Sequence, residues 1–283
     1  MNATEYLIKH EKLDLRIRLH PSDSLLLHEE TIPYRVAELK ESFKRDTVVK
    51  DPIIVDDGSS VVLDGMHRVA ALRELGCMCV PVCAVDYSDP SIKVAVWYRA
   101  LIGSVSPDQF QAALSSLGIK IERYLVDKEG IKKTVPPSTL FASGECLRLS
   151  SCDLGSYQIV KTTEGHARDL GLTIVFETEH DALEKLLNTK VDAIITVPSI
   201  DKKSVREAGL MGRLYPHKLT RHIIPARPLG VNTPLATLID EKTTLKEKNQ
   251  RFVANLQARG IVRNTAGAII EGRRYEEETF IFK

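Results

Sequence analysis

The sequence has almost no net charge. Its 283 residues carry 39 Lys and Arg against 38 Asp and Glu, a formal net charge of +1. A chain without a strong overall field does not attract nucleic acid or an anionic membrane surface as a whole. We therefore expect neither as a partner, and any anion that this protein binds must be held by local groups.

Long apolar runs are also missing. No uninterrupted apolar stretch approaches the roughly 20 residues needed to cross a bilayer. The opening stretch, MNATEYLIKHEKLD, lacks the apolar core of a secretion signal. These features predict a cytoplasmic protein, and no internal repeat or low-complexity segment is present.

Cysteine is scarce and odd in number, with five residues, which favours reduced thiols over a disulfide framework. Cys77, Cys79 and Cys83 are close enough in the sequence to suggest a metal cluster. However, alternating residues on one strand point to the same face, and no fourth ligand completes the set. Small buried thiols that pack a strand are the preferred interpretation.

The chain has the material for two domains. A hydrophobic content of 43% allows a sizeable core, and the length favours two domains over one. To about residue 104, the patterns predict a mixed sheet with two helices. The expected elements are a strand over 13–19, a helix from Pro33 through Phe43, strands over 52–55 and 61–64, a helix ending before Gly76, and strands over 80–85 and 94–101.

A second set of helices and strands follows Pro107. We expect helices from Pro107 and over 181–187, 202–208 and 243–259, and strands over 157–160, 173–176 and 191–197. Gly260 ends the last helix, and a charged tail around a short strand includes Arg273 and Arg274.

The stretch Val61–Gly76, VVLDGMHRVAALRELG, is the most informative part of the chain. A short apolar run ends in Asp64 and Gly65, and a helical pattern begins beside His67 and Arg68, which predicts a strand, a tight turn and a helix. The free N–H groups of a first helical turn suit a phosphate, and a carboxylate at the strand end suits its metal ion. The alternative is an ordinary Asp-Gly turn that binds nothing.

A second candidate site is the basic segment between Pro216 and Pro225. Lys218, Thr220, Arg221 and His222 offer basic or titratable donors and one hydroxyl, which could clamp a nucleotide phosphate. A solvated basic loop is the alternative interpretation.

The segment VVLDGMHRVAALRELGCMCVPV resembles the core of the ParB/sulfiredoxin fold, whose members bind nucleotides at a Gly-x-x-Arg element, here Gly65 to Arg68. Within that superfamily the chain resembles the free L-serine kinases, ADP- or ATP-dependent enzymes that make O-phospho-L-serine. The matching pieces are, in order, His28-Glu29, Ser42, Asp64 to Arg68, Val96-Trp97-Tyr98 and Lys218 to Pro225. The early acid together with the late Thr220-Arg221-His222 element makes the resemblance specific.

The resemblance implies a fold and a set of roles. The fold would be α/β (α+β), with a ParB/sulfiredoxin-like domain over 1–104, a second α/β domain over 105–283, and an active site in the cleft between them. Glu29 would be the catalytic base, Asp64 a second essential carboxylate and the metal ligand, and Ser42, His67 and Trp97 would surround the substrate. The nucleotide would contact Gly65, Met66, His67, Arg68, Lys218, Thr220, Arg221 and His222. The family often has His where Met66 stands, so no role of that side chain carries over.

The implied reaction fits the residues. Phosphoryl transfer needs positioning, an acid to orient and deprotonate a hydroxyl, a hard cation such as Mg²⁺, and fixed cationic donors. The expected substrates are L-serine and ADP or ATP; the donor, the range of acceptors and the oligomeric state stay open. For Glu29, an exposed acid beside a helix start is the alternative.

Three rival functions follow from the same resemblance. A sulfiredoxin-type reductase is disfavoured, because its chemistry needs a nucleophilic Cys at the position of Met66. A ParB-like nucleotide switch that loads onto DNA predicts a helix-turn-helix with a basic face, and neither is evident. A regulator without kinase activity, which binds the phosphoamino acid or a cofactor, is the third alternative, although the presence of both Glu29 and Asp64 favours the enzyme.

Overall fold

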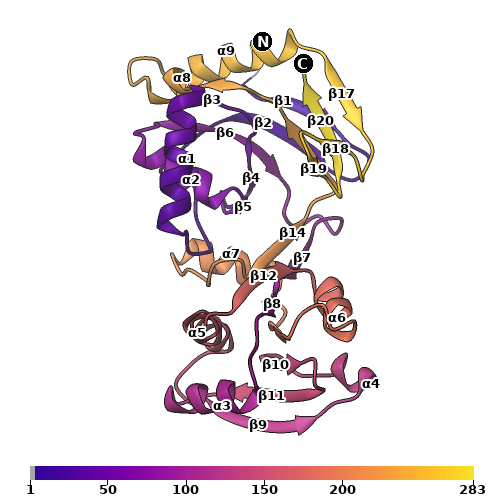
Figure 1. Cartoon of the computed structure of the whole chain (residues 1–283). Coiled ribbons are helices and arrows are strands. Elements are labelled where there is room, and N and C mark those ends of the chain that lie inside the picture. Colours follow the sequence, from indigo (N-terminus) through magenta and orange to yellow (C-terminus); the bar gives the residue numbers. More distant parts are fainter. Residues whose placement is uncertain (1–3) are drawn as a thin grey trace. The chain divides into compact units, whose positions relative to one another are not determined.

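The computed structural model describes residues 4–283, which form two compact units (Figure 1). The first unit comprises Met1–Val94, Asp201–His217 and His222–Lys283, and the second comprises Ala95–Ile200 and Lys218–Arg221. The sequence suggested one boundary near residue 104. The structure instead returns the last third of the chain to the unit that contains the N-terminal strands.

The first unit is built on a five-stranded mixed sheet. Its strand order is β1-β2-β6-β4-β5, with β4 parallel to β6 and the other pairs antiparallel. The elements before the chain enters the second unit are β1 (Tyr6–Lys9), β2 (Asp14–Pro21), α1 (Pro33–Asp46), β3 (Val48–Val49), β4 (Ile53–Asp56), β5 (Val62–Asp64), α2 (Met66–Glu74) and β6 (Cys79–Val85). Strand β7 (Lys93–Val96) begins in the first unit and ends in the second.

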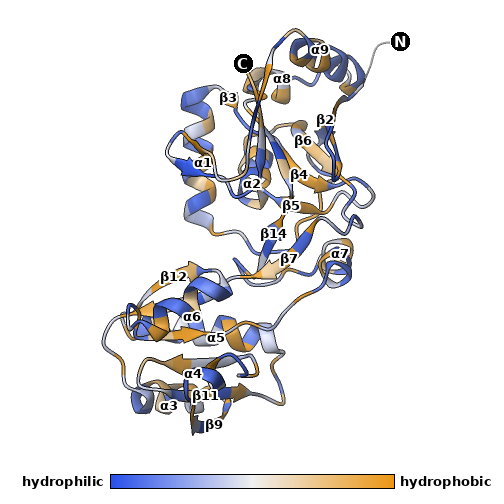
Figure 2. Cartoon of the chain, turned by 90° about the vertical axis from the view of Figure 1, so that its right-hand side faces the viewer, coloured by the Kyte–Doolittle hydropathy of each residue, from blue (hydrophilic) through white to orange (hydrophobic). Residues whose placement is uncertain are grey.

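The mixed sheet and both helices predicted for this region are therefore confirmed. Strand β2 buries Leu15, Ile17 and Leu19 and turns its arginines outward, as a period-2 pattern predicts. Strand β6 is buried at every position, and Figure 2 shows β4 and β6 as hydrophobic. Strands covered on both faces carry continuous apolar runs.

The C-terminal part of the chain completes the same unit. It adds α7 (Lys202–Leu210), β15 (Ala226–Leu229), β16 (Thr233–Pro234), α8 (Leu235–Ile239), α9 (Leu245–Gln257), β17 (Ile261–Asn264), β18 (Ile269–Ile270), β19 (Arg273–Arg274) and β20 (Glu278–Phe282). Strand β14 (Thr220–Ile223) begins in the second unit and ends in the first. Strand β20 is the centre of the three-stranded sheet β15-β20-β17. The expected charged tail thus ends in a strand that buries Phe280 and Phe282.

The second unit contains a six-stranded sheet in which every pair is antiparallel, in the order β12-β8-β13-β10-β11-β9. Its elements are β8 (Tyr98–Ile102), α3 (Pro107–Ser116), β9 (Lys120–Leu125), α4 (Lys128–Ile131), β10 (Ser138–Phe141), β11 (Glu145–Ser150), α5 (Ser156–Asp169), β12 (Thr173–Glu177), α6 (Glu179–Leu187) and β13 (Ala193–Ile195). No helix within residues 4–283 is long and apolar enough to span a membrane.

Three local predictions were wrong. Residues 157–160, expected to form a strand, lie in helix α5. A short apolar run is compatible with a strand or a helix, and here the buried residues continue to Ala167 at helical spacing. The strand expected over 94–101 is interrupted at Trp97, whose N–H donates to the Leu219 carbonyl at 3.3 Å. The basic loop between the prolines becomes strand β14 from Thr220, paired with β7.

The three clustered cysteines pack the sheet, as the preferred interpretation predicted. Cys77, Cys79 and Cys83 are buried, and burial raises the pKa of each thiol, to about 12 for Cys77 and Cys83.

Helix α9 is tied to the sheet by one buried amide, which generates a stability prediction. Strand β1 pairs with β2 only as far as Ile17, and beyond it Asn249 accepts from the Leu19 N–H (2.7 Å) and donates to the Leu19 carbonyl (3.0 Å). Replacing Asn249 by Ala leaves both peptide groups unsatisfied, at roughly 1–3 kcal/mol for each. Urea unfolding should show this loss, whereas Asn255→Ala, on the exposed side of α9, should change the free energy little. Equal stabilities of the two variants would contradict the assignment.

Candidate active site

The turn between β5 and α2 has the predicted strand, turn and helix geometry. Gly65 adopts φ 105°, a conformation that L side chains rarely take. A Cβ at this position would lie 2.8 Å from Nη2 of Arg68. Gly65 makes no side-chain cap, and the start of a helix is a place where anions commonly bind.

Asp64, the last residue of β5, is held between arginines. Its Oδ2 lies 2.8 Å from Nη1 of Arg227 and 3.5 Å from Nη2 of Arg68, and its side chain is 42% exposed. Burial opposes ionisation, but the charges of Arg227 and Arg68 outweigh it and hold the carboxyl pKa well below its usual range. Asp64 therefore carries a full negative charge at neutral pH and has accessible oxygen, which suits a hard divalent cation.

The two arginines are themselves fixed. Arg68 donates through Nη1 to the carbonyls of Asp51 (2.8 Å) and Pro52 (3.1 Å), and Arg227 donates through Nε to Glu277. Asp64, Arg68, Arg227, Arg273 and Tyr275 line a cavity of about 210 Å³. The predicted contact of Arg68 with nucleotide phosphates stays a prediction, because the guanidinium is here engaged with backbone carbonyls.

Glu29 is buried, with 5% of its surface exposed. The backbone on either side pairs with Tyr215: the Glu30 N–H donates to the Tyr215 carbonyl (2.9 Å), and the Tyr215 N–H donates to that of His28 (2.8 Å). The alternative of an exposed acid beside a helix start is therefore wrong. These bonds hold the backbone on both sides of the buried Glu29.

Two imidazoles lie at this segment, that of the buried His28 and that of the half-buried His222. The rings of His28 and His222 are 5.5 Å apart, and Nε2 of His222 shares a hydrogen bond of 2.8 Å with the Tyr87 hydroxyl. Burial lowers the pKa of His28 to about 4. Burial and the neighbouring His28 lower the pKa of His222 to about 3, although Asp64 and a hydrogen bond with the Leu63 backbone oppose the shift. Both rings are neutral at pH 7, so His222 offers a hydrogen bond rather than a charge.

His67 connects the turn to helix α1. Its Nε2 accepts from the Ile32 N–H at 3.0 Å, and its ring meets that of His217 edge-on at 5.0 Å. Within the first unit, the contacts described so far join residues 28–32, the β5–α2 turn, residues 215–217 and His222. The segment that carries Glu29 and the turn that carries Asp64 thus belong to one neighbourhood.

A further group of predicted site residues gathers in the second unit. Nζ of Lys218 lies 5.1 Å, and Cζ of Arg221 5.4 Å, from the centroid of the Trp97 ring. Both distances are within the range of cation–π attraction. Thr220, between the two cations, is buried.

Ser42 and Met66 are the predicted residues with the least support from the structure. Ser42 is on α1, where its hydroxyl donates to Asp46 and accepts from Arg45, each at 3.3 Å. These bonds lie within one exposed helix face and join Ser42 to no other predicted site residue. Met66 begins α2 and is half-buried. Their ligand contacts stay predictions.

Several residues that lie beside predicted site residues were missed by the sequence reasoning. In the first unit, His28 was noted beside Glu29 without a role, and His217, Tyr87 and Arg227 were not singled out. In the second unit, Arg99 was not singled out. His217 lies within the segment between Pro216 and Pro225 and could have been included, and Arg99 directly follows the Val96-Trp97-Tyr98 piece of the resemblance. Tyr87 and Arg227 give no local signal.

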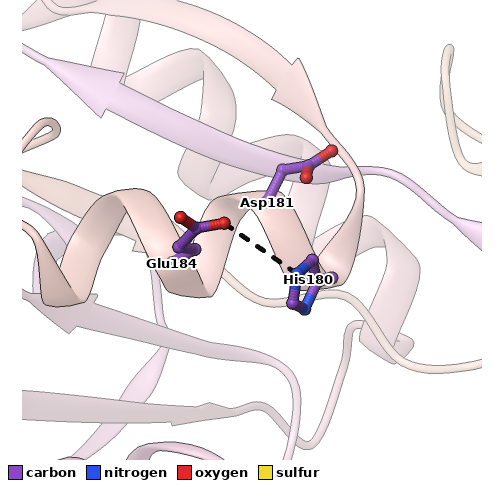
Figure 3. Close-up of side chains that lie close together, drawn as sticks. All are labelled: His180, Asp181 and Glu184. Atoms are coloured by element: carbon purple, nitrogen blue, oxygen red, sulfur yellow. Dashed lines mark ion pairs between the residues drawn. The ribbon is translucent and has the colours of Figure 1, made fainter.

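Among residues 4–283, one group of potential metal ligands stands out by proximity, and it lies elsewhere. His180, Asp181 and Glu184 are exposed at the start of α6, with His180 and Glu184 3.9 Å apart (Figure 3). Asp181 accepts from the Thr178 hydroxyl at 2.7 Å within the N-terminal cap, where helix N–H groups repel a cation. Asp181 thus belongs to the helix cap, and His180 and Glu184 form an i,i+4 pair on the helix surface.

Comparison with known proteins identifies the family. No family model matches the chain. The ATP-dependent L-serine kinase of Staphylothermus marinus is 33% identical over 229 residues, which cover 76% of this chain and 88% of that protein. This chain belongs to the L-serine kinase family.

Two further comparisons agree. The ATP-dependent L-serine kinase SbnI of Staphylococcus aureus is 34% identical over 246 residues, covering 84% of this chain and 91% of that protein. The solved structure of a free serine kinase in complex with AMP has the same fold, with a TM-score of 0.67, 21% identity and coverage of 82% of this chain and 97% of that chain. The resemblance and fold class inferred from the sequence are confirmed.

The buried His28 should make the stability of this member of the L-serine kinase family depend on pH. Since its pKa is about 4 when folded and near 6.5 when unfolded, the unfolded state binds more protons between these values. The contribution of neutral His28 to the free energy of unfolding is complete above pH 6.5 and is lost as the pH falls towards 4. Between pH 7 and 5 the free energy of unfolding should fall by roughly 2 kcal/mol. Urea unfolding at several pH values should show a flatter dependence for His28→Gln than for the wild type.

The control for this measurement is His180→Gln, which removes an imidazole that is 86% exposed. It should keep the wild-type pH dependence. A His28→Gln protein with the wild-type slope would place the destabilising protonation elsewhere.

Proposed function

We propose that this protein is a free L-serine kinase that transfers the terminal phosphoryl group of ATP or ADP to the serine hydroxyl, giving O-phospho-L-serine. The observation that carries the proposal is the 33% identity, over 76% of the chain, to an enzyme named ATP-dependent L-serine kinase. The buried Glu29 and the ionised Asp64, in one unit, are the kind of groups this reaction needs. We place the enzyme in the cytoplasm, as its sequence suggests.

Glu29 is assigned as the general base. Its carboxylate would accept the proton of the serine hydroxyl while the serine oxygen forms a bond to the terminal phosphorus. The bond between that phosphorus and the bridging oxygen breaks, and the electron pair leaves with the nucleotide, now ADP or AMP. General-base assistance of this kind contributes about 10²–10⁴-fold in rate.

Asp64 is assigned as the carboxylate that holds Mg²⁺. Magnesium usually takes one or two carboxylates together with substrate phosphates, and Asp64 supplies a charged, partly exposed oxygen. Bound there, the ion would neutralise charge on the phosphate oxygens. Arg227 and Arg68 orient the same carboxylate, so its position does not depend on the ion.

The remaining residues are assigned to binding. The N–H groups at Gly65, Met66 and His67 suit a phosphate at the helix start. Lys218, Thr220 and Arg221, with the neutral His222 as a hydrogen-bonding group, would contact the nucleotide phosphates. Serine would be recognised by Ser42, His67 and Trp97.

The decisive assay is direct. Purified protein is incubated with Mg²⁺, a panel of nucleotides and a panel of hydroxyl amino acids, and products are identified by mass spectrometry. We expect O-phospho-L-serine and loss of one phosphate from ATP or ADP. Nucleotide binding without any phosphorylated amino acid would support a ParB-like binding protein without kinase activity instead.

The same assay tests Glu29. Glu29→Gln should remain folded, bind nucleotide and lose about 10²–10⁴-fold in kcat, because the amide cannot accept the hydroxyl proton. Glu38→Gln, on the exposed face of α1, is the matched control and should leave kcat unchanged. Near-wild-type turnover of Glu29→Gln would remove the general-base assignment.

Arg221 has a different expected signature. Arg221→Ala should raise the nucleotide Kd by about 10-fold or more, since a hydrogen bond to a charged group contributes roughly 1.5–3 kcal/mol. Isothermal titration with ADP measures this change. Arg213→Ala, which removes an exposed arginine from a neighbouring stretch of sequence, should not alter the Kd. An unchanged Kd for Arg221→Ala would place Arg221 outside the nucleotide site.

A further inference from the structure

The second unit contains a buried charge to which the proposed reaction assigns no role. Arg99, on strand β8, is fully buried. Its Nε donates to Glu164 of helix α5 at 2.9 Å, and its guanidinium lies over the Phe176 ring at 5.2 Å. Burying a guanidinium costs several kcal/mol unless every donor finds a good acceptor, so the remaining contacts of Arg99 matter.

Those contacts join two segments that are far apart in the sequence. Nη1 of Arg99 donates to the carbonyl of Trp97 at 2.6 Å and to that of Lys218 at 3.3 Å. Next to these bonds, the Trp97 N–H donates to the Leu219 carbonyl. Arg99 therefore fixes the backbone on which Trp97 and the Lys218–Arg221 segment are carried.

Lys218 is itself in an unusual conformation. Its φ is 58°, in the left-handed region that favours glycine. A lysine persists there only where surrounding bonds enforce the turn. The hydrogen bond from Arg99 to the Lys218 carbonyl is such a bond, and the turn directs the lysine side chain over the Trp97 ring.

The side chains on this backbone form one group. Lys218 and Arg221 both lie within 5.4 Å of the Trp97 centroid. An indole face attracts cations without neutralising their charge. Two cations gathered on one aromatic ring make a preformed site for a polyanion.

We propose that Arg99 is a positioning residue that presets Trp97, Lys218 and Arg221 as one recognition unit for the phosphates of a nucleoside di- or triphosphate. Trp97 then serves as the platform that holds both cations. The inference rests on the proposed function for its ligand, and it adds Arg99 and a second role for Trp97 to the binding machinery. The competing explanation is that Arg99 only closes the core of the second unit.

Arg168 separates these two explanations. It also pairs with Glu164, but its side chain is 54% exposed and its ion pair stays within helix α5. Arg168→Met therefore removes an arginine from the same carboxylate without touching the Trp97 and Lys218 carbonyls. It is the matched control for every variant of Arg99.

Trp97 is the only tryptophan of the chain, so intrinsic fluorescence reports directly on the platform. Arg99→Lys keeps the charge beside Glu164 but lacks the planar fork that bonds Glu164 through Nε and the two carbonyls through Nη1 at the same time. In folded protein we expect an altered Trp97 emission spectrum and a rise of at least about 10-fold in the Kd and KM for Mg-ADP or Mg-ATP. The kcat at saturating nucleotide should change less than KM, and Arg168→Met should match the wild type in all four readouts.

A second variant covers the case in which Arg99→Lys does not fold. The double substitution Arg99→Met with Glu164→Met removes both charges of the buried pair, a change that proteins often tolerate. It should give the same weakened binding, with circular dichroism confirming the fold. Folded variants with a wild-type emission spectrum and Kd would overturn the proposal, and so would lowered thermal stability with unchanged binding.

The outcomes for the wild type distinguish this inference from the kinase assignment. Quenching of Trp97 by Mg-ADP without formation of phosphoserine would contradict the kinase and leave the recognition unit standing. Formation of phosphoserine with no response of Trp97 to any nucleotide would contradict the recognition unit and leave the kinase standing.

Discussion

The ion pair between Asp64 and Arg227 fixes the position and charge of the Asp64 carboxylate. Residues from distant segments of the first unit support this pair. Arg227 donates to Asp64 from 163 residues away in the sequence and is itself held by Glu277. Arg68 approaches the same oxygen and is anchored on two backbone carbonyls. This arrangement keeps a partly exposed acid ionised at the end of a strand, where a bare carboxylate could otherwise rotate or take up a proton.

Two histidines of the first unit are neutral at pH 7. Burial holds His28 and His222 uncharged, and Tyr87 hydrogen-bonds to His222. Lys202 and Arg206 lie over the Tyr87 ring, with Nζ at 5.4 Å and Cζ at 5.8 Å from its centroid. Besides His28, the charges that act on His222 are those of Asp64, which favours its protonation, and of Lys202, which opposes it. The two imidazoles therefore contribute hydrogen-bonding groups rather than charges.

In the second unit, Lys218 and Arg221 are held on one aromatic ring, which is the basis of the proposed recognition unit. Arg99 holds the backbone there, and Trp97 contributes its ring. Preorganised donors avoid the entropic cost of ordering long side chains on binding. The buried pair of Arg99 and Glu164 costs free energy for folding, which a purely apolar core would not.

The sequence by itself determined the local elements and the family. The change from period 2 to helical spacing at Asp64-Gly65 defined the turn, Pro33 marked the start of α1, and Glu29, Asp64 and the Thr220-Arg221-His222 element identified the relatives. Local patterns suffice there because strand, turn and cap preferences act over a few residues. Only the tertiary structure decided that the chain returns to its first unit after residue 201, that residues 157–160 are helical, and that Arg227 reaches Asp64 and Arg99 reaches Lys218. Each of these depends on contacts between residues far apart in the sequence, where an arginine paired with a distant partner looks the same as one on the surface.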